Sequence, residues 1–400
     1  MTYLDWAATT PPDPQILAQA AEIAAESFGN PSSKHKLGLE AKSVLELARS
    51  RFETALCSRS TGKKGRLVFT GGGSEADAIA ILAVLRQAMN ARRDGSIKRL
   101  HVVTTEIEHA AVYEEAHLLK ALGLDVSFVK PEPDGCVDPQ KIAAAVEKDT
   151  ALVAVMAVNN ETGAVQPIAD IAKAIAEAAV AFGRKSPRFH VDAVQALGKI
   201  AFDPQAAGVS SAAFSAHKIR GPRSVGALWV ADCAPIEPLA LGGGQETGLR
   251  PGTESIQGAW AFAQAAEAAA TSFDARIALA RELEAHLISG LGSIPGVYAL
   301  PAGRIAGDPR YSPLILSIAF PGLSGEVLVR ALSDAGVAVS TGSACSANAK
   351  RAGRRVIEAM GVAPPLALSA IRVSTGDLTT CAEIDIFLEA ASDAYRRLKT

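Results

Sequence analysis

The sequence predicts an α/β protein with a large domain, in which helices cover both faces of a mostly parallel sheet of the seven-stranded type, and a smaller α+β domain. Up to residue 230, short apolar segments alternate with segments of helical periodicity, a pattern that produces a parallel sheet between two layers of helices. After the glycine-rich loop 241–253 this alternation ends. We therefore expect the large domain at residues 15–255, and the small domain at residues 1–14 and 256–400.

The composition is that of an ordinary globular protein with a sizeable core. The chain has 400 residues, of which 48% are hydrophobic and 20% charged, and its net charge is −2, so no basic surface for nucleic acid is expected. The N-terminus lacks the regions of a signal peptide, and the longest apolar run, 151–158, is far too short to span a bilayer. We expect a cytoplasmic protein with neither nucleic acid nor a membrane as partner.

The cysteines disfavour a disulfide framework and a zinc knuckle. Their number is odd and none are spaced as Cys-x-x-Cys. They are Cys57, Cys136, Cys233, Cys345 and Cys381. No resident metal is expected.

The large domain begins with two predicted helices. The first starts after Pro14 and ends at the Gly- and Pro-containing loop 28–33, and the second covers about 38–56. A strand at 66–70 and a helix at 75–89 follow. The remaining elements alternate, with strands at 100–105, 126–129, 152–158, 189–191, 212–215 and 227–230, and helices at 110–122, from Pro139, and at 168–182.

The small domain is predicted after an alanine-rich helical region that runs to about Leu291. A final helix ends at Leu398 and opens with a capping box at Thr380–Glu383. The other elements expected in this domain are strands at 315–320, 337–339 and 370–374 and a helix at 324–335.

A run of three glycines joins the strand 66–70 to its helix. Gly73 and Ser74 stand at the expected helix start, where free backbone N–H groups and the helix dipole favour an anion. The turn has neither the Gly-x-Gly-x-x-Gly pattern nor the lysine of a Walker loop, which disfavours a nucleotide. A phosphate cradle and a tight turn that needs the positive φ of glycine are both compatible with this sequence.

Polar residues follow several of the predicted strands. In parallel sheets ligands bind beyond the carboxyl ends of the strands, so these side chains would meet at one edge. Any one of them could be a helix cap or a turn residue, but capping does not explain why all lie at the same edge. The residues are Ser74, His109, Asn160, Asp192, Gln195, Ser215, His217 and Lys218.

Lys218 carries the chemical argument. It directly follows the apolar strand 212–215, where an ammonium group is costly to bury, and a desolvated lysine can hold a carbonyl cofactor as a Schiff base. Together with a phosphate cradle and Asp192, it fits pyridoxal 5′-phosphate (PLP), which needs a lysine, a phosphate anchor and a carboxylate against its pyridine nitrogen. His109 could stack on the ring, and Gln195 could bond its phenolic oxygen.

One thiol, Cys345, lies in a run of small residues at 340–348. A cysteine usually packs as a small apolar side chain. Flanking serine, glycine and alanine in a loop favour a reactive group instead. Above a PLP site, such a thiol could attack an electrophilic sulfur.

Short segments in the same order along nearly the whole chain carry a family resemblance: 3–10, 28–33, 108–112, 158–163, 190–195, 215–222, 249–253, 343–346 and 371–374. Together they resemble the cysteine desulfurases of the NifS/IscS type, in the fold-type I PLP superfamily. The resemblance implies an enzyme that takes sulfur from L-cysteine, leaving L-alanine and a persulfide on Cys345. The persulfide would pass to an acceptor protein for iron–sulfur cluster or thio-cofactor biosynthesis.

The resemblance also implies a role for each matching residue. Lys218 would bind PLP covalently, and Asn160 and Arg372 would orient the substrate, Arg372 by a bidentate grip on its carboxylate. Cys345 would carry sulfur in a loop like the longer, flexible loop of the IscS group, and could touch an iron–sulfur cluster transiently.

The remaining implied roles concern the ring and phosphate of the cofactor. His109 would stack on the ring and transfer protons, Asp192 would pair with the pyridine nitrogen, and Gln195 with the phenolic oxygen. The implied phosphate ligands are Gly73, Ser74, Ser215, His217 and Thr253. Of these, Thr253 would reach in from the partner subunit of a homodimer.

The chain departs from the family pattern at a few positions. Gly73-Ser74 replaces the usual Ala-Thr, and Ala76-Asp77-Ala78 replaces Ser-Asp-Asn. Leu241 stands where the family has histidine, and Thr247 where arginine is common, which bears on substrate gating and partner choice. The sequence leaves the sulfur acceptor open among an iron–sulfur scaffold, a relay protein and a tRNA-thiolation enzyme.

Three alternatives to a desulfurase are open. A selenocysteine lyase would be closest, and a class V aminotransferase or lyase would keep Lys218 and Asp192 without needing Cys345. An inactive paralogue is disfavoured because the reactive residues are all retained.

Overall fold

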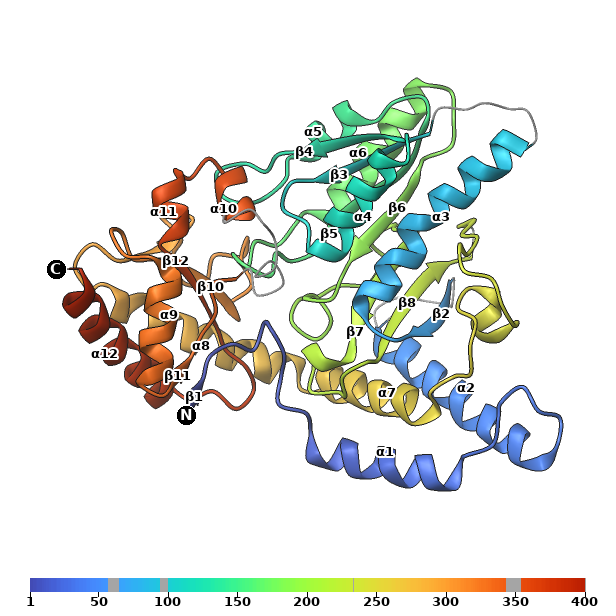
Figure 1. Cartoon of the computed structure of the whole chain (residues 1–400), viewed down its shortest axis with the longest axis horizontal. Coiled ribbons are helices and arrows are strands. Elements are labelled where there is room, and N and C mark those ends of the chain that lie inside the picture. The colour runs from blue at the N-terminus through green and yellow to red at the C-terminus, as the bar shows by residue number, and fades with distance from the viewer. Residues whose placement is uncertain (57–64, 94–99, 233, 343–353, 400) are drawn as a thin grey trace.

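The computed structural model describes residues 1–56, 65–93, 100–232, 234–342 and 354–399. Figure 1 shows two parts side by side, a large one built around a central sheet and a smaller one that holds both termini. The N-terminal segment runs from the smaller part along the boundary to α1 on the larger part. Cys345 lies outside the described residues.

The central sheet has the strand order β2-β8-β7-β6-β5-β3-β4. Only β8 runs antiparallel to its neighbours β2 and β7, and every other pair is parallel. The strands are β2 (Gly65–Thr70), β3 (His101–Thr105), β4 (Asp125–Val129), β5 (Thr150–Met156), β6 (Arg188–Asp192), β7 (Ser211–Ser215) and β8 (Gly226–Ala231). The prediction of a mostly parallel seven-stranded sheet is therefore confirmed.

Helices cover both faces of this sheet. Neighbouring strand residues point to opposite faces, and the apolar side chains on each face pack against helices. Leu67 and Phe69 pack in the cluster that includes α2 and α7, whereas Val68 packs against α3. Within the first cluster, the Phe52 ring packs edge-on against Phe262, with centroids 4.7 Å apart. The helices of the large part are α1 (Pro14–Glu26), α2 (Lys36–Leu56), α3 (Gly73–Arg93), α4 (Ala110–Ala121), α5 (Pro139–Ala145), α6 (Ile168–Ala181) and α7 (Ile256–Thr271).

The smaller part has its own apolar core. In it, β10 pairs antiparallel with β9 and β12, and β1 pairs parallel with β11. Its strands are β1 (Thr2–Tyr3), β9 (Tyr298–Leu300), β10 (Ile315–Ala319), β11 (Val337–Ala338) and β12 (Ala370–Ser374), and its helices are α8 (Phe273–Leu291), α9 (Gly325–Asp334), α10 (Arg355–Ala359), α11 (Pro364–Leu368) and α12 (Cys381–Leu398). The capping box predicted at the start of α12 is present.

The alanine-rich region expected to run to about Leu291 forms two helices, α7 and α8. Ala259, Ala263 and Ala266 of α7 pack in the large core, and Leu283 and Leu287 of α8 pack in the small one. Small alanine side chains let α7 lie close to α2, which explains the alanine-rich sequence. Whether the predicted ranges are independent folding units stays a prediction. Among the described residues, none of the helices combines the length and apolarity needed to cross a membrane.

Candidate active site

A cavity of about 1050 Å³ opens at the carboxyl ends of the parallel strands. Most residues that the sequence singled out line it: Gly73, Ser74, His109, Asn160, Asp192, Gln195, Ser215, His217, Lys218 and Arg372. All except Arg372 lie at or after the carboxyl ends of strands of the large sheet. Arg372 comes from β12, so the small part closes one side of the cavity.

Lys218 lies at the end of a short 3-10 helix (Ala216–Lys218) that directly follows β7. Its Nζ donates hydrogen bonds to the carbonyl oxygens of Ala7 and Ala8, both at 2.7 Å. The irregular N-terminal segment therefore supplies main-chain acceptors to the lysine.

The N-terminus of α3 forms a second wall. Gly72 has a φ of +157°, which residues with side chains rarely adopt, and a Cβ on Gly73 would lie 2.6 Å from Cγ2 of Val194, so Val194 would have to shift for a larger residue. Within the described chain, nothing accepts from the backbone N–H groups of Gly73 and Ser74. These donors line the cavity at the positive end of a helix dipole, which suits a phosphate.

His217 adds a neutral imidazole to this wall. Burial, followed by the charges of Lys218, Lys199 and Arg223, lowers its pKa to about 4. One ring nitrogen, Nδ1, lies 3.1 Å from Oγ1 of Thr9. The ring is therefore uncharged at neutral pH when no anion lies in the cavity.

Asp192 ends β6 and is 5% exposed. One oxygen, Oδ1, accepts from the backbone N–H of Val194 at 3.0 Å. Burial raises the pKa of this carboxyl, while the charges of His109 and Lys218 oppose the shift. A cationic ring nitrogen in the cavity would stabilise the carboxylate form, so the residue suits the partner of a protonated pyridine.

His109 caps α4, because its Nδ1 accepts from the backbone N–H of Ala111 at 3.1 Å. The capping role that the sequence left open is therefore real, and it does not exclude a role in the cavity. With Nδ1 accepting, a neutral ring carries its proton on Nε2. The helix cap thus fixes the tautomer of a ring that lines the cavity.

Arg372 is held by the chain itself. Its Nη2 donates to Oδ1 of Asp5 at 2.6 Å and its Nη1 to the main-chain oxygen of Asn160 at 2.8 Å. Nε has no hydrogen-bond partner among the described residues. Asn160 thus contributes its carbonyl to the arginine, and Asp5 orients the guanidinium at the cavity wall.

Glu108 was missed by the sequence argument. It is 1% exposed, and its Oε1 accepts from the Thr105 hydroxyl at 2.6 Å and from the Met156 N–H at 3.1 Å. Burial raises its pKa to about 8, with a further contribution from the charge of Asp192. This residue lines the cavity as a carboxylic acid at neutral pH.

We predict that Glu108 makes the cofactor-free protein less stable at alkaline pH. The folded pKa of about 8 lies above the ordinary 4.5, so this contribution to stability is full below pH 4.5 and is lost as the pH rises through 8. Glu108→Gln resembles the protonated form. The free energy of unfolding of this variant should exceed that of wild type by about 2 kcal/mol at pH ~9. At pH ~5 the two proteins should be about equally stable.

Denaturant unfolding of both proteins at these two pH values checks this prediction. The matched control is Glu106→Gln, two positions earlier and only partly buried, which should follow the wild-type curve. Parallel pH dependence in wild type and Glu108→Gln would show that the carboxyl is not protonated in the fold.

Asp77 and His190 form a buried polar pair, and Asp77 also lines the cavity. Nε2 of His190 lies 3.0 Å from Oδ1 of Asp77, and Nδ1 lies 2.9 Å from the Ser211 hydroxyl. Burial lowers the pKa of His190 to about 3 and raises that of Asp77. The pair therefore shares one proton as a neutral bridge between α3 and β6.

Two predicted residues are not brought to the cavity by this chain. Thr253 is exposed and does not line the cavity, so its predicted role depends on a partner subunit. Cys345 lies outside the described residues. The described residue nearest to it on its N-terminal side, Gly342, lines the cavity.

Comparisons with known proteins agree on one family. The sequence profile of the family Aminotransferase class-V matches residues 2–387. The cysteine desulfurase IscS of Anaeromyxobacter dehalogenans (strain 2CP-C) is 37% identical over 403 residues, which cover 99% of this chain and 93% of the relative. The chain belongs to the class-V aminotransferase family, in its NifS/IscS group of cysteine desulfurases.

Solved structures support membership of this group. A NifS-like protein superposes with a TM-score of 0.84 at 33% identity and covers 99% of this chain and 100% of its own. The structure titled SspA in complex with cysteine has a TM-score of 0.77 at 27% identity, covering 95% of this chain and 100% of its own. Class-V aminotransferases are PLP enzymes, which agrees with the donors and acceptors that line the cavity.

Proposed function

We propose that this NifS/IscS-type enzyme binds PLP in the large cavity, removes sulfur from L-cysteine and carries it as a persulfide on Cys345. The observation that carries the proposal is that Asp192 ends β6, Lys218 follows the neighbouring strand β7, and both line one cavity. PLP requires a lysine to hold it covalently and a carboxylate against its pyridine nitrogen, both in the same site. The cysteine complex of SspA, a structural relative, supports L-cysteine as the substrate.

The residues present fit PLP. Lys218 would hold it covalently, Asp192 would face the pyridine nitrogen, and Gln195 the phenolic oxygen. His109 would lie against the ring. The phosphate would take donors from Gly73, Ser74, Ser215 and His217, and from Thr253 of a second copy.

Bound PLP supplies an electron sink that weakens bonds at the α- and β-carbons of an amino acid. The protein's part is to place and move protons. Nε2 of His109 carries the proton of a fixed tautomer, and Nζ of Lys218 accepts or returns one at the substrate α-carbon. Arg372, preset by Asp5, would bind the substrate carboxylate through N–H groups that its contacts with Asp5 and Asn160 do not use.

Sulfur transfer needs a nucleophile in addition. The thiolate of Cys345 would attack the substrate sulfur, forming an S–S bond as the C–S bond breaks. The electron pair of the broken bond stays with carbon, which takes up a proton and becomes the methyl group of L-alanine. Sulfur is oxidised and carbon is reduced, so no external oxidant is required.

A direct assay tests the proposal. Purified protein loaded with PLP and supplied with L-cysteine and a dithiol reductant should release sulfide and L-alanine in equal amounts. Mass spectrometry without the reductant should find one or more extra sulfur atoms on the peptide that contains Cys345. Release of pyruvate and ammonia in place of L-alanine would instead indicate a lyase.

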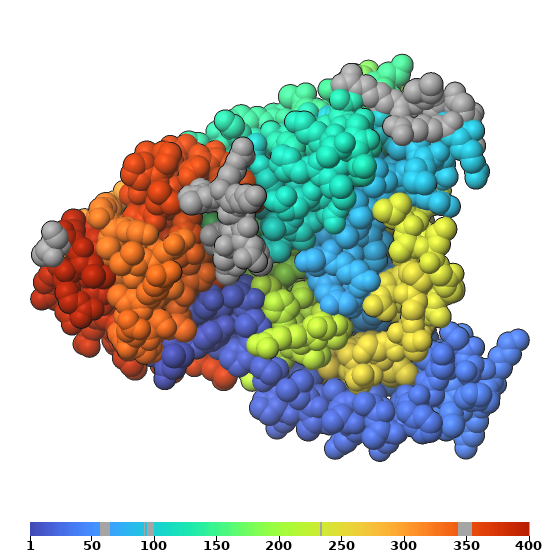
Figure 2. All heavy atoms as spheres, viewed as in Figure 1, coloured from blue at the N-terminus to red at the C-terminus, as the bar shows by residue number. Residues whose placement is uncertain are grey.

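We predict a homodimer whose interface includes the surface around α1 and α2. Large apolar side chains are exposed on this surface. Figure 2 shows the N-terminal segment that contains α1 and α2 in dark blue along the lower edge of the molecule. They are Leu17, Phe28, Leu37, Leu39 and Leu47. Light scattering at micromolar concentration should give twice the chain mass, and Phe28→Glu should shift the protein toward monomer and weaken PLP retention.

The matched control for the dimer is Val180→Glu. Val180 is 75% exposed, close to the 71% of Phe28, but it lies on α6. This variant should stay dimeric. A wild-type monomer that retains PLP fully would contradict the prediction.

A further inference from the structure

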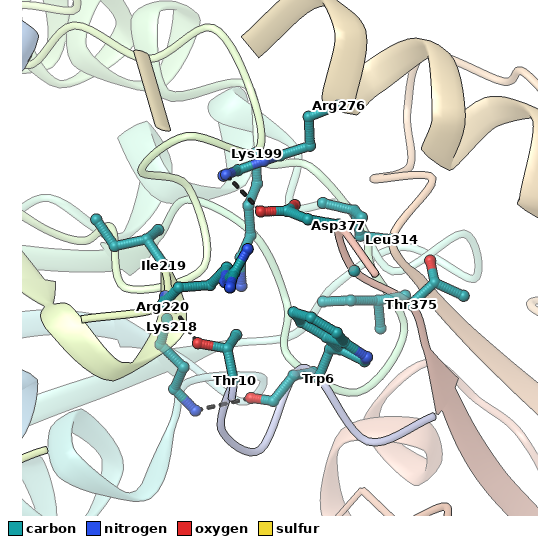
Figure 3. Close-up of a pocket in the computed structure, with 13 residues that line it drawn as sticks. Trp6, Thr10, Lys199, Lys218, Ile219, Arg220, Arg276, Leu314, Thr375 and Asp377 are labelled. Atoms are coloured by element: carbon teal, nitrogen blue, oxygen red, sulfur yellow. Dashed lines mark hydrogen bonds and ion pairs between the residues drawn. The ribbon is translucent and has the colours of Figure 1, made fainter. Parts of the chain in front are cut away.

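A second lysine is buried close to Lys218. Lys199 is 7% exposed and lies in the turns that follow β6. Figure 3 shows it with Lys218, Arg220 and Arg276 around a small cavity of about 20 Å³. Among the described residues no carboxylate lies within ion-pairing distance of Lys199, and the nearby Asp377 is paired with Arg276 at 2.8 Å.

Burying an amine in this way costs free energy unless the amine is hydrogen-bonded. Nζ of Lys199 donates to Oε1 of Gln195 at 2.6 Å. The amide nitrogen of Gln195 donates to the carbonyl oxygen of Ala7 at 2.8 Å, and Nζ of Lys218 donates to the same oxygen at 2.7 Å. A chain of three hydrogen bonds therefore joins the two lysines.

This chain fixes which way the Gln195 amide faces. A main-chain carbonyl can only accept, so the amide nitrogen must face Ala7, beside Lys218. The amide oxygen must then face Lys199, which supplies a donor. Each end of the amide is thus specified by a group of the required type.

The donor role of Lys199 does not depend on its charge. The charged and titratable groups that face its surroundings are Lys218, Arg220, Arg276, Arg372, Asp377 and His217. Burial lowers the pKa of Lys199 well below its ordinary value, the neighbouring cations add to this effect, and Asp377 opposes it. Both the ammonium and the neutral amine carry N–H groups that can donate to Gln195.

We propose that Lys199 is a positioning residue, which holds the Gln195 amide so that its nitrogen faces the cofactor side of the large cavity. The inference rests on the proposed function, because the oxygen that would accept from this nitrogen is the phenolic oxygen of PLP. Without Lys199 only the Ala7 carbonyl specifies the orientation, so the amide turns over more readily and then presents its own oxygen there, where two acceptors repel. Lys199 thereby favours the anionic form of the phenolic oxygen.

The test is a pH titration of the near-visible absorbance of the purified holoenzyme, without substrate. Lys199→Met keeps the length of the side chain and removes the donor, so the midpoint should rise by about one pH unit. Gln195→Ala should shift it in the same direction. Lys199→Gln, which keeps an N–H donor without the charge, should restore most of the wild-type midpoint.

A double variant separates positioning from a general effect of charge. If Lys199 acts through the amide, Lys199→Met combined with Gln195→Ala should shift the midpoint no further than Gln195→Ala alone. The packing control is Thr375→Val. Thr375 lines the same small cavity, and its hydroxyl has no partner among the described residues. It should titrate like wild type.

A wild-type midpoint in Lys199→Met, or additive shifts in the double variant, would overturn the positioning role and leave the proposed function intact. Failure of the proposed function would look different, because wild type itself would then bind no PLP with near-visible absorbance. If Lys199→Met does not fold, Lys199→Ala takes its place, with the same expected shift.

Discussion

Lys218→Ala is expected to lower desulfurase turnover by about 10²–10⁴-fold or more, because it removes both the covalent link to PLP and a proton-transfer group. The physical reason is the position of its amine in the cavity. Nζ of Lys218 is fixed by the carbonyls of Ala7 and Ala8 at the end of β7, and it lines the same cavity as Asp192. Activity should not return when PLP is added in excess, because free PLP lacks this amine.

Attachment can be measured independently of turnover. Borohydride reduction of the holoenzyme followed by peptide mass spectrometry should place the mass of reduced PLP on Lys218. The matched control is Lys130→Ala, because Lys130 is an exposed lysine that lines the same cavity, and this variant should keep both label and activity. A label on Lys130 or on the buried Lys199 would contradict the assignment of the whole site.

The positions of most candidate residues could be predicted because the rule behind them is geometric. Parallel strands place their carboxyl ends at one edge, so a polar residue after each apolar strand must lie near the others. His109, Asp192 and Lys218 meet in the cavity for this reason. The short strands β1 and β9 were missed because two or three residues carry little periodicity, although the equally short β11 lies within the predicted strand 337–339.

Glu108 and Lys199 show where sequence reasoning ends. Glu108 lies within the motif segment 108–112 and Lys199 lies four residues after Gln195, and charged residues in turns are usually solvated. Glu108 and Lys199 are buried instead, and their burial depends on packing between elements distant in sequence. Lys199 becomes interpretable only when the N-terminal segment is seen to bring Ala7 next to Gln195. Thr253 is a further case, because its expected role lies in another copy of the chain.

Cys345→Ser is expected to lower sulfide release from L-cysteine on the order of 10³-fold while leaving PLP binding unchanged. Under the proposed mechanism, removal of the substrate α-proton needs Lys218, Asp192 and His109 but not Cys345. Breaking the C–S bond toward a persulfide also needs a thiolate, and the hydroxyl of serine is far less nucleophilic at neutral pH. The variant should therefore show absorbance changes with L-cysteine but form no L-alanine.

Two other cysteines provide the controls for this experiment. Burial raises the pKa of Cys136 to about 12, so its thiol is protonated and unreactive, and Cys381 lies at the start of α12. Cys136→Ser and Cys381→Ser should each keep activity within about threefold, as expected for positions outside the site. Wild-type rates in Cys345→Ser would overturn the desulfurase mechanism in favour of an aminotransferase or lyase. Loss with L-cysteine but retention with selenocysteine would favour a selenocysteine lyase, because selenium leaves carbon more readily than sulfur does.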